Sequence, residues 1–289
     1  MSTVPSLPSR WHRYSGQTAW IMGVLNCTPD SFSDGGKFIE DQLNVDAAVE
    51  YALAMVEDGA AIIDIGGEST RPGAVAVPVD VELSRTVPVI EQLSKHKILI
   101  SIDTMKAEVM RRSIEAGATM VNDVSALTGD QESLSVVAEA GVEICLMHMQ
   151  GTPETMQQKP GYRNVVRDVS DYLKQRVEVC LKAGISESSI IVDPGIGFGK
   201  RLEDNLDLIA GIKALKSNLG LPVLMGVSRK SFLGTITGSA VDSREVETAA
   251  AVSVCAYAGA DLLRVHDVGT QCRAATIGSR LRDASLRLS

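Results

Sequence analysis

Three things are scarce in this sequence: aromatic residues, paired cysteines and long apolar runs. Aromatic residues make up 4% of the 289 residues, so aliphatic side chains must fill the core. The five cysteines show no C-x-x-C spacing, which argues against a disulfide framework or a zinc site and favours a reducing compartment. No apolar stretch reaches the roughly 18 residues of a membrane helix, and the N-terminus lacks a signal-peptide core. We therefore expect a soluble cytoplasmic protein that does not use a membrane.

Positive charge is scarce as well. The formal net charge is −8, which would repel a phosphate backbone over most of the surface and argues against nucleic-acid binding. A small anionic substrate needs only a local cluster of positive groups. The candidates for such a cluster are Arg71, Lys230, Arg264 and His266.

The sequence does contain eight short apolar runs that can be read as β-strands. They are continuous instead of alternating, which is typical of strands covered on both sides. After most of them comes a residue that could do chemistry. These residues are Asn26, Asp64, Asp103, Asn122 with Asp123, His148, Asp193, the segment Ser228 to Lys230, and Arg264 with His266.

Helical periodicity fills the intervals between the apolar runs. Each strand and helix together take roughly 30 to 40 residues, the length of a right-handed βα crossover. Glycines that can cap a helix at positive φ stand before five of the runs, at Gly59, Gly117, Gly141, Gly184 and Gly259. The predicted helices span 45–57, 81–93, 107–115, 134–140, 165–182, 205–216, 245–257 and 271–280.

Strands that alternate with helices, and that carry polar groups where they end, predict a single (β/α)8 TIM barrel. Its active site is expected at the C-terminal ends of the strands. The chain length fits one barrel of about 250 residues and leaves nothing for a second domain. We expect a loose N-terminal tail over residues 1–16 and the barrel over residues 17–289.

Two loops, 28–36 and 66–73, are longer than a barrel needs. Both combine glycines with hydroxyl and acidic side chains, and the second also contains Arg71. Loops of this kind on a catalytic face commonly act as lids. Two solvated turns fit the same composition, so both interpretations stay open.

The segment Asp193-Pro-Gly-Ile-Gly-Phe-Gly-Lys200 has the composition of a phosphate loop without its spacing. Its glycines fit neither the Walker pattern nor the dinucleotide-binding pattern. Two interpretations remain. The backbone could pass close to a flat ligand, with Phe198 packed on it, or the segment could be a strained structural turn.

Asp64, Asp103 and Asp193 emerge from apolar strands, where an unpaired carboxylate is unfavourable. The N–H groups of a heterocyclic ring would satisfy them, and Asn122 would add a donor and an acceptor to the same edge. The alternatives are an internal ion network with Lys230 and Arg264, or capping of the helices that follow.

Arg264 and His266 are one residue apart, so both point the same way from a strand end. A guanidinium group and a second donor suit a diphosphate. Cys27 has no histidine in a recognisable catalytic arrangement, and we interpret it as a packing residue. His148 is assigned no role.

Seven segments together resemble one known family, the dihydropteroate synthases of the pterin-binding barrels. The resemblance covers nearly everything from Ile21 to Val268. The segments are Leu25-Asn-Cys-Thr-Pro-Asp-Ser-Phe-Ser-Asp34, Asp64-Ile-Gly-Gly-Glu-Ser-Thr-Arg-Pro-Gly73, Ser101-Ile-Asp-Thr104, Asn122-Asp-Val-Ser125, Asp193-Pro-Gly-Ile-Gly-Phe-Gly199, Ser228-Arg-Lys-Ser-Phe232 and Arg264-Val-His266.

The resemblance implies a transferase of folate biosynthesis. It would join 6-hydroxymethyl-7,8-dihydropterin diphosphate to 4-aminobenzoate, releasing pyrophosphate. The partners would be these small molecules and a second copy in a homodimer. Sulfonamides would compete for the aminobenzoate pocket. Arg71, Lys230 and Asp103 would be the catalytic residues, and Asn26 would bind the Mg²⁺ cofactor.

The same resemblance assigns residues to each substrate. The pterin ring would contact Asp103, Asn122, Asp193 and Lys230. The diphosphate would contact Thr70, Arg264 and His266. The aminobenzoate pocket would be shaped by Phe32, Arg71, Pro72, Phe198 and Ser228.

Two other functions would use the same framework. One is a methyltransferase of the pterin-binding superfamily, which has no need of a diphosphate cluster. The other is a catalytically silent pterin-binding paralogue. The long loops with Arg71 and the segment Ser228 to Lys230 favour the synthase over the first. Asp34 and Thr70, with Arg71, argue against the second, because a silent copy would be free to lose them.

Overall fold

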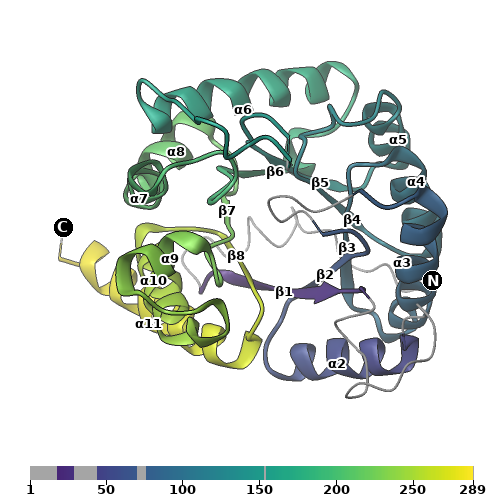
Figure 1. The fold of residues 1–289 in the computed structure, drawn as a ribbon, viewed down its shortest axis with the longest axis horizontal. Helices are drawn as coiled ribbons and strands as arrows, with labels where there is room; N and C mark the ends of the chain where they lie inside the picture. The colour runs from purple at the N-terminus through teal and green to yellow at the C-terminus, as the bar shows by residue number, and fades with distance from the viewer. Residues whose placement is uncertain (1–17, 29–43, 70–75, 153, 289) are drawn as a thin grey trace.

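The computed structural model describes residues 18–28, 44–69, 76–152 and 154–288. The predicted tail and most of the first long loop lie outside these residues. Within them, eight parallel strands alternate with helices and form the predicted (β/α)8 barrel (Figure 1). No helix of the described segments is long and apolar enough to cross a membrane.

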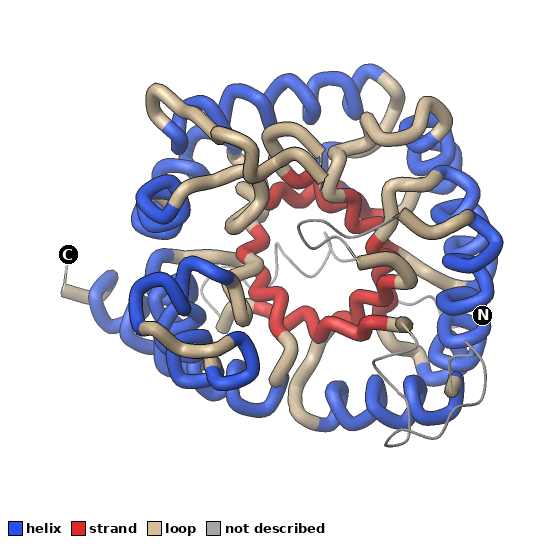
Figure 2. The backbone as a smooth tube through the Cα atoms, viewed as in Figure 1, coloured by secondary structure: helices blue, strands red, loops and turns tan. Residues whose placement is uncertain are grey.

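The strands form one sheet with the order β6-β5-β4-β3-β2-β1-β8-β7. Between β6 and β7 the described residues form one bridge, Val192 with Val223, which closes the ring drawn in red in Figure 2. The strands are β1 (Trp20–Asn26), β2 (Ile62–Gly66), β3 (Leu99–Asp103), β4 (Met120–Asp123), β5 (Glu143–Met147), β6 (Ile190–Asp193), β7 (Leu224–Met225) and β8 (Leu262–Val265).

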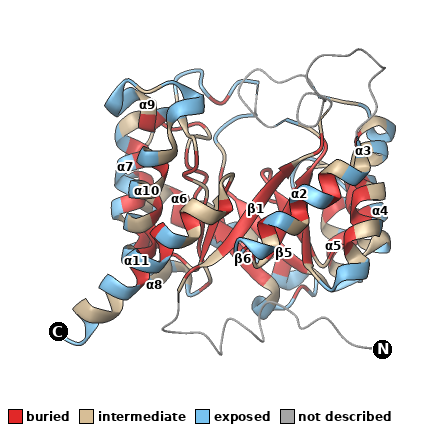
Figure 3. Ribbon diagram, turned by 90° about the horizontal axis from the view of Figure 1, so that it is seen from below, coloured by how far each residue is buried: buried red, intermediate tan, exposed pale blue. Residues whose placement is uncertain are grey.

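The helices surround this ring and bury their inner faces against it (Figure 3). α2 and α6 have the predicted bounds, because Asn44 and Asn164 cap their first turns with side-chain oxygens. The helices are α2 (Val45–Glu57), α3 (Val79–Leu93), α4 (Ala107–Ala116), α5 (Ser133–Ala140), α6 (Val165–Lys182), α7 (Leu202–Ala210), α8 (Ile212–Leu219), α9 (Ser231–Thr237), α10 (Glu245–Ala258) and α11 (Val268–Leu286).

Two helix predictions need correction. The predicted helix 205–216 is two helices, α7 and α8, which meet at Gly211. A Cβ at Gly211 would lie 2.7 Å from a methyl group of Val166, so the chain approaches α6 closely there. α9 is absent from the sequence prediction, because its residues Gly234, Thr235 and Ile236 have weak helix propensity. The five predicted glycine caps are confirmed, with φ values from 65° to 122°.

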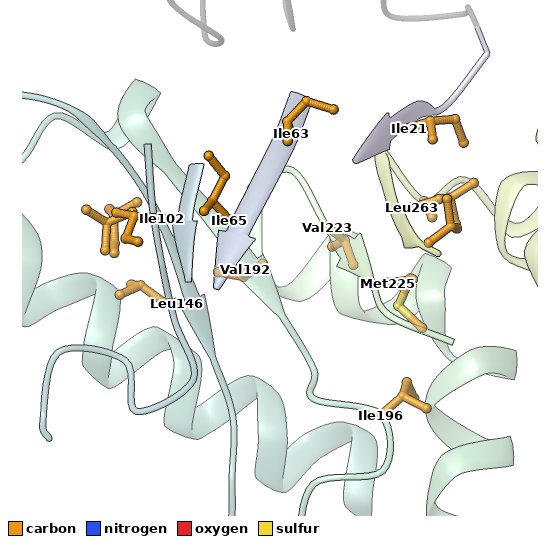
Figure 4. Close-up of a cluster of buried hydrophobic side chains, with 14 of the residues drawn as sticks. Ile21, Ile63, Ile65, Ile102, Leu146, Val192, Ile196, Val223, Met225 and Leu263 are labelled. Atoms are coloured by element: carbon orange, nitrogen blue, oxygen red, sulfur yellow. The ribbon is translucent and has the colours of Figure 1, made fainter. Parts of the chain in front are cut away.

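Alternate residues of each strand face opposite sides of the barrel wall. Outward-facing residues such as Ile65, Ile102 and Leu146 belong to the core between the strands and the helices (Figure 4). Inward-facing residues near the start of the strands form an apolar layer, to which each strand contributes one side chain. This apolar layer consists of Met22, Ile62, Leu99, Met120, Cys145, Ile191, Leu224 and Leu262.

The next inward-facing positions toward the strand ends are mostly polar. We call this set the polar layer: Asp64, Ser101, Asp103, Asn122, Asp193 and Arg264. Asp64 corrects one expectation, because it lies in the middle of β2 and not after it. A carboxylate at this depth has a relative exposure of 0%. The polar layer therefore closes the barrel interior directly above the apolar layer.

Candidate active site at the C-terminal ends of the strands

Arg264 of β8 lies at the centre of the polar layer. Its Nε donates to Asp64 Oδ2 at 2.6 Å, and its Nη2 donates to Asp103 Oδ2 at 2.7 Å. The amide of Asn122 also donates to Asp64 Oδ2, at 3.0 Å. Although burial acts to lower it, these carboxylates hold the pKa of Arg264 above its ordinary value. The internal ion network, one of the two alternatives for the aspartates, therefore exists for Asp64 and Asp103.

Three buried polar atoms in this layer have no hydrogen-bond partner among the described residues: Asp64 Oδ1, Asp103 Oδ1 and Ser101 Oγ. Burial raises the pKa of Asp103 to about 7, although Arg264 acts to lower it and Asp64 raises it further. A buried carboxylate oxygen without a donor is unfavourable. The site can therefore accept N–H groups from a bound ligand.

Asp193, the last residue of β6, lies close enough to Arg264 for their charges to interact and makes a hydrogen bond of its own. Its Oδ1 accepts a hydrogen bond from Gly195 N at 2.7 Å. Burial raises the pKa of Asp193, against the opposing effects of the Gly195 N–H group and of Lys230. Lys230 Nζ lies 4.1 Å from the centre of the Phe198 ring, a cation–π distance. Asp193, Phe198 and Lys230 thus form a second part of the site.

The glycines between Asp193 and Lys200 have different packing roles. A Cβ at Gly195 would lie 2.0 Å from His148 O, and one at Gly199 would lie 2.7 Å from Gln150 O. A Cβ at Gly197 would lie 3.1 Å from Lys230 Cδ, so Gly197 faces the Lys230 side chain. Gly195 and Gly199 have positive φ, and no side chain would fit at either position because the backbone after β5 lies against them. Of the two interpretations of this segment, the structural turn is confirmed for these two glycines.

Ser228 and His266 lie together beyond the ends of β7 and β8. Ser228 Oγ is 2.9 Å from His266 Nδ1 and accepts from His266 N at 3.3 Å. Arg229, between Ser228 and Lys230, turns away from the site and pairs with Glu245 of α10 at 2.6 Å. The pair Ser228 and His266 can present a hydrogen-bond donor to an anion near Arg264.

Asn26 is the last residue of β1. It is in register with Gly66, which is in register with Asp103, so Asn26 reaches the same level of the barrel as the polar layer. Its neighbour Cys27 is fully buried in the hydrophobic core, and burial raises its pKa to about 12. This agrees with the interpretation of Cys27 as a packing residue, because a thiol with that pKa is a poor nucleophile.

Four predicted site residues, Phe32, Thr70, Arg71 and Pro72, lie outside the described residues. The flanks of the second loop are described. Lys106 Nζ bridges Glu68 Oε2 at 2.6 Å and Glu82 Oε2 at 2.5 Å, and Glu68 Oε1 accepts from Val77 N. Sequence analysis missed this network, because nothing local links residues 38 and 24 positions apart.

Sequence analysis also missed a contact between Lys200, which ends the glycine-rich segment, and His148. Lys200 Nζ is 3.0 Å from His148 Nδ1, and both residues are buried. The sequence signal was present, since Lys200 closes the glycine-rich segment and His148 follows β5. Neither residue alone, however, predicted that the two side chains would be in contact.

Comparisons with known proteins agree with this geometry. Residues 22–266 match the family model described as "Pterin binding enzyme". Dihydropteroate synthase of Escherichia coli strain K12 is 43% identical over 249 residues, which cover 86% of each chain. The Xanthomonas albilineans enzyme, solved with 4-aminobenzoic acid, is 44% identical with a TM-score of 0.83 and covers 92% of this chain and 93% of that chain. The Yersinia pestis enzyme, solved in a sulfonamide drug complex, is 41% identical with a TM-score of 0.84, covering 92% and 94%.

Proposed function

This chain belongs to the pterin-binding enzyme family, and we infer from that membership and from its polar layer that it is a dihydropteroate synthase. It joins 6-hydroxymethyl-7,8-dihydropterin diphosphate to 4-aminobenzoate and releases pyrophosphate. The observation that carries this conclusion is the identity of about 43% to such synthases over most of the chain. The same relatives favour the synthase over the methyltransferase and the silent paralogue.

For the pterin ring, we propose contacts with Asp103, Asn122, Asp193 and Lys230. Among the residues that the structure describes, the buried Asp103 Oδ1 has no hydrogen-bond partner, and the buried Asp193 ends β6 at the same face of the barrel. A pterin edge carries N–H donors and ring-nitrogen acceptors. Carboxylates would accept from the former, and the lysine ammonium would donate to the latter. The ring would lie beside Phe198, which is half-buried.

For the diphosphate, we propose contacts with Arg264 and His266, and with Thr70 of the second loop. Nε and Nη2 of Arg264 donate to carboxylates. Substrate can therefore contact Nη1 and the flat face of the guanidinium group. His266 is held by Ser228 and can keep a donor directed at an anion. For aminobenzoate, we propose Phe32, Arg71 and Pro72 together with Phe198 and Ser228.

Mg²⁺ is the proposed cofactor. Magnesium usually keeps several waters and takes few protein ligands beside substrate phosphates. The described residues fit that mode, because Asn26 at the end of β1 would supply one amide oxygen at the level of the polar layer. Bound there, Mg²⁺ would neutralise charge on the diphosphate. Removal of Mg²⁺ should abolish turnover, and the Asn26→Ala variant should need more Mg²⁺ for half-maximal rate.

We propose a dissociative order of bond changes. The bond between the pterin methylene and the diphosphate oxygen would break first, leaving a conjugated cation that the arylamine then attacks. Two observations support this order: the site gathers positive groups, and the buried thiol of Cys27 offers no activated nucleophile. A rate that rose steeply with the basicity of substituted anilines would instead favour a concerted displacement.

We also propose a homodimer built on the outer faces of α10 and α11. These helices cross closely, since a Cβ at Gly278 would lie 2.1 Å from Ser253 O. Beside the crossing, large apolar side chains face outward: Val246 is 81% exposed, and Val254 and Ile277 are 52% and 59% exposed. Tyr257 and Leu281 extend the same surface. Exposed apolar side chains on two helices that pack together suit contact with a second copy of the chain.

The dimer can be tested by sedimentation. The double variant Val254→Asp, Ile277→Asp should sediment as a monomer at concentrations where the original chain is dimeric. Leu181→Asp, on α6, is a matched control at an exposed leucine remote from α10 and is expected to leave the dimer intact. A dimer unaffected by the double variant would remove this surface from consideration.

One assay tests the reaction itself. Purified protein is mixed with dihydropterin diphosphate, 4-aminobenzoate and Mg²⁺, and pyrophosphate and dihydropteroate are measured. Both products should appear in equal amounts, and a sulfonamide should compete with 4-aminobenzoate. Pyrophosphate release without dihydropteroate would contradict the proposed condensation. We propose the cytoplasm as the compartment, because all five cysteines are unpaired.

A further inference from the structure

Lys200 is a buried lysine whose ammonium group meets only uncharged acceptors. Its relative exposure is 4%. Its Nζ lies 3.0 Å from His148 Nδ1, 3.2 Å from His148 O and 3.0 Å from Phe198 O. The three N–H donors of the charged ammonium group need acceptors, so whenever Lys200 is charged His148 accepts at Nδ1 and keeps its proton on Nε2. Burial of such a charge is unfavourable, which calls for a specific role.

These hydrogen bonds connect two segments of the barrel mouth. His148 directly follows β5, and His148 N donates to Asp193 O of β6. Phe198 belongs to the glycine turn, which we define as residues 194–199. Lys200 is thus a tie between the end of β5 and the glycine turn.

Other hydrogen bonds hold the glycine turn from the outside. Tyr162 donates to Gly199 O at 2.6 Å, and Gln157 donates to Gly197 O at 2.9 Å. Asn205 of α7 accepts from Gly197 N at 2.7 Å. None of these ties reaches Phe198, whose carbonyl is held by Lys200.

The position of Phe198 matters because it carries the second part of the site. Lys230 Nζ lies over its ring, and the Lys230 stem packs on Gly197. Asp193 is bonded to the same turn through Gly195 N. A shift of the turn would therefore move Phe198 and Lys230 relative to Asp193.

The charged and titratable groups that face Lys200 are Asp193 of β6, Lys230 before α9, Asp204 of α7, His148 after β5 and Tyr162 before α6, whose ring centre lies 6.0 Å from Lys200 Nζ. Burial lowers the pKa of Lys200 to about 7, an effect opposed by Asp193 and Asp204 and strengthened by Lys230. Burial and the nearby Lys200 lower the pKa of His148 to about 3, so His148 stays a neutral acceptor at neutral pH.

We propose that Lys200 is a positioning residue for the pterin substrate. By tying the Phe198 carbonyl to His148, it holds Phe198, Lys230 and Asp193 in one arrangement before the ring binds. This inference rests on the proposed function. It assigns Lys200 a larger effect on the pterin substrate than on 4-aminobenzoate, because Phe198, Lys230 and Asp193 all lie beside the proposed pterin position and only Phe198 also belongs to the proposed aminobenzoate pocket.

The test compares Lys200→Met with the original protein. Methionine keeps the approximate length and removes the ammonium group. We expect the dissociation constant for 6-hydroxymethylpterin, measured by calorimetry, to rise on the order of tenfold, as for one lost orienting hydrogen-bond network. KM for dihydropterin diphosphate should rise similarly, while KM for 4-aminobenzoate should change less than about twofold.

The matched control is Lys216→Met. Lys216 Nζ also ties two segments, through Gly259 O at 2.8 Å and Asp261 Oδ1 at 2.7 Å, but at the opposite end of the barrel. It should lower stability and leave both KM values unchanged. If Lys200→Met does not fold, His148→Leu removes the Nδ1 acceptor and should weaken pterin binding in the same direction.

The outcomes separate the inference from the proposed function. An original protein that does not bind the pterin contradicts the function. An original protein that binds it, with equal affinity in a folded Lys200→Met variant or its substitute His148→Leu, contradicts the role of Lys200 alone. Parallel increases in both KM values would also overturn it, because they would indicate general loosening and not positioning.

Discussion

The apolar layer and the polar layer lie on the same strands but have different functions. On β8, Leu262 belongs to the apolar layer, and Arg264, two residues later, holds Asp64 and Asp103. On β6, Ile191 and Asp193 show the same change. A shift of two residues along a strand thus separates a side chain that stabilises the barrel from one that can bind substrate. Substitutions at paired positions can test how complete this division is.

The largest effect is expected at Arg264. Its substitution should lower both the stability of the barrel and the turnover of substrate, although the residue belongs to the polar layer. Arg264→Met leaves two buried carboxylates without their cation. We expect the free energy of unfolding at pH 8 to fall by about 3–5 kcal/mol, together with loss of turnover. Urea unfolding and the pyrophosphate assay measure the two effects.

A compensated variant sharpens this result. Adding Asp64→Asn and Asp103→Asn to Arg264→Met removes the uncompensated charges and should restore much of the stability without restoring turnover. Recovered turnover would show that the ion network itself is dispensable for substrate binding.

Leu262→Ala, on the same strand, should affect stability alone. Leu262 is fully buried, so its truncation should lower the free energy of unfolding by about 2–5 kcal/mol through lost burial and a cavity. KM for both substrates should stay unchanged at temperatures where the variant is folded. A selective change in pterin KM would mean that the apolar layer also shapes the site.

Asp193→Asn should have the opposite profile. Asparagine can still accept from Gly195 N, but it lacks the charge that attracts pterin N–H groups. Pterin affinity should fall by about 1.5–3 kcal/mol, as for a charged hydrogen bond, with little loss of stability. Lys230→Ala should likewise weaken pterin binding, whereas Arg71→Ala should mainly reduce turnover with aminobenzoate. Equal mild effects from all three variants would contradict the assigned roles.

The smallest effect concerns pH. Burial raises the pKa of Asp103 to about 7, whereas an unfolded aspartate titrates near about 4. Between these values the native state binds more protons, so stability that is present below about pH 4 is lost as the pH rises through about 7. Asp103→Asn should lack this decline, which urea unfolding at pH 5 and pH 8 can measure. If the Asp103→Asn variant lost the same stability between pH 5 and pH 8, the titrating group would be a residue other than Asp103.

Sequence patterns predicted the framework because its signals are local. The caps Asn44 and Asn164 and the glycines at helix ends act within a few residues of the positions that they define. The break at Gly211 was missed, because it depends on the approach of α6 across the fold. The short helix α9 was missed because its propensity is weak.

The candidate site was predictable as a set of residues but not as a set of contacts. Apolar runs followed by polar residues indicated which side chains lie at the barrel mouth. They left open whether Arg264 would pair with the aspartates, as it does with Asp64 200 positions away, and they did not indicate that Lys200 would meet His148. Such pairings depend on which strands become neighbours and on depth within the barrel, and neither is encoded by local spacing.

The bridge between Val192 and Val223 gives the barrel a natural seam. β8 pairs with β1 over four residues, whereas among the described residues β6 meets β7 at this one bridge. A chain cut at Gly220 would therefore separate into a six-stranded piece and a two-stranded piece that can still recognise each other through β1 and β8. Fragment complementation should succeed at this position more readily than at cuts beside β3 or β4. Because Asp193 directly follows Val192, transient opening of the seam would also displace Asp193 in the substrate pocket.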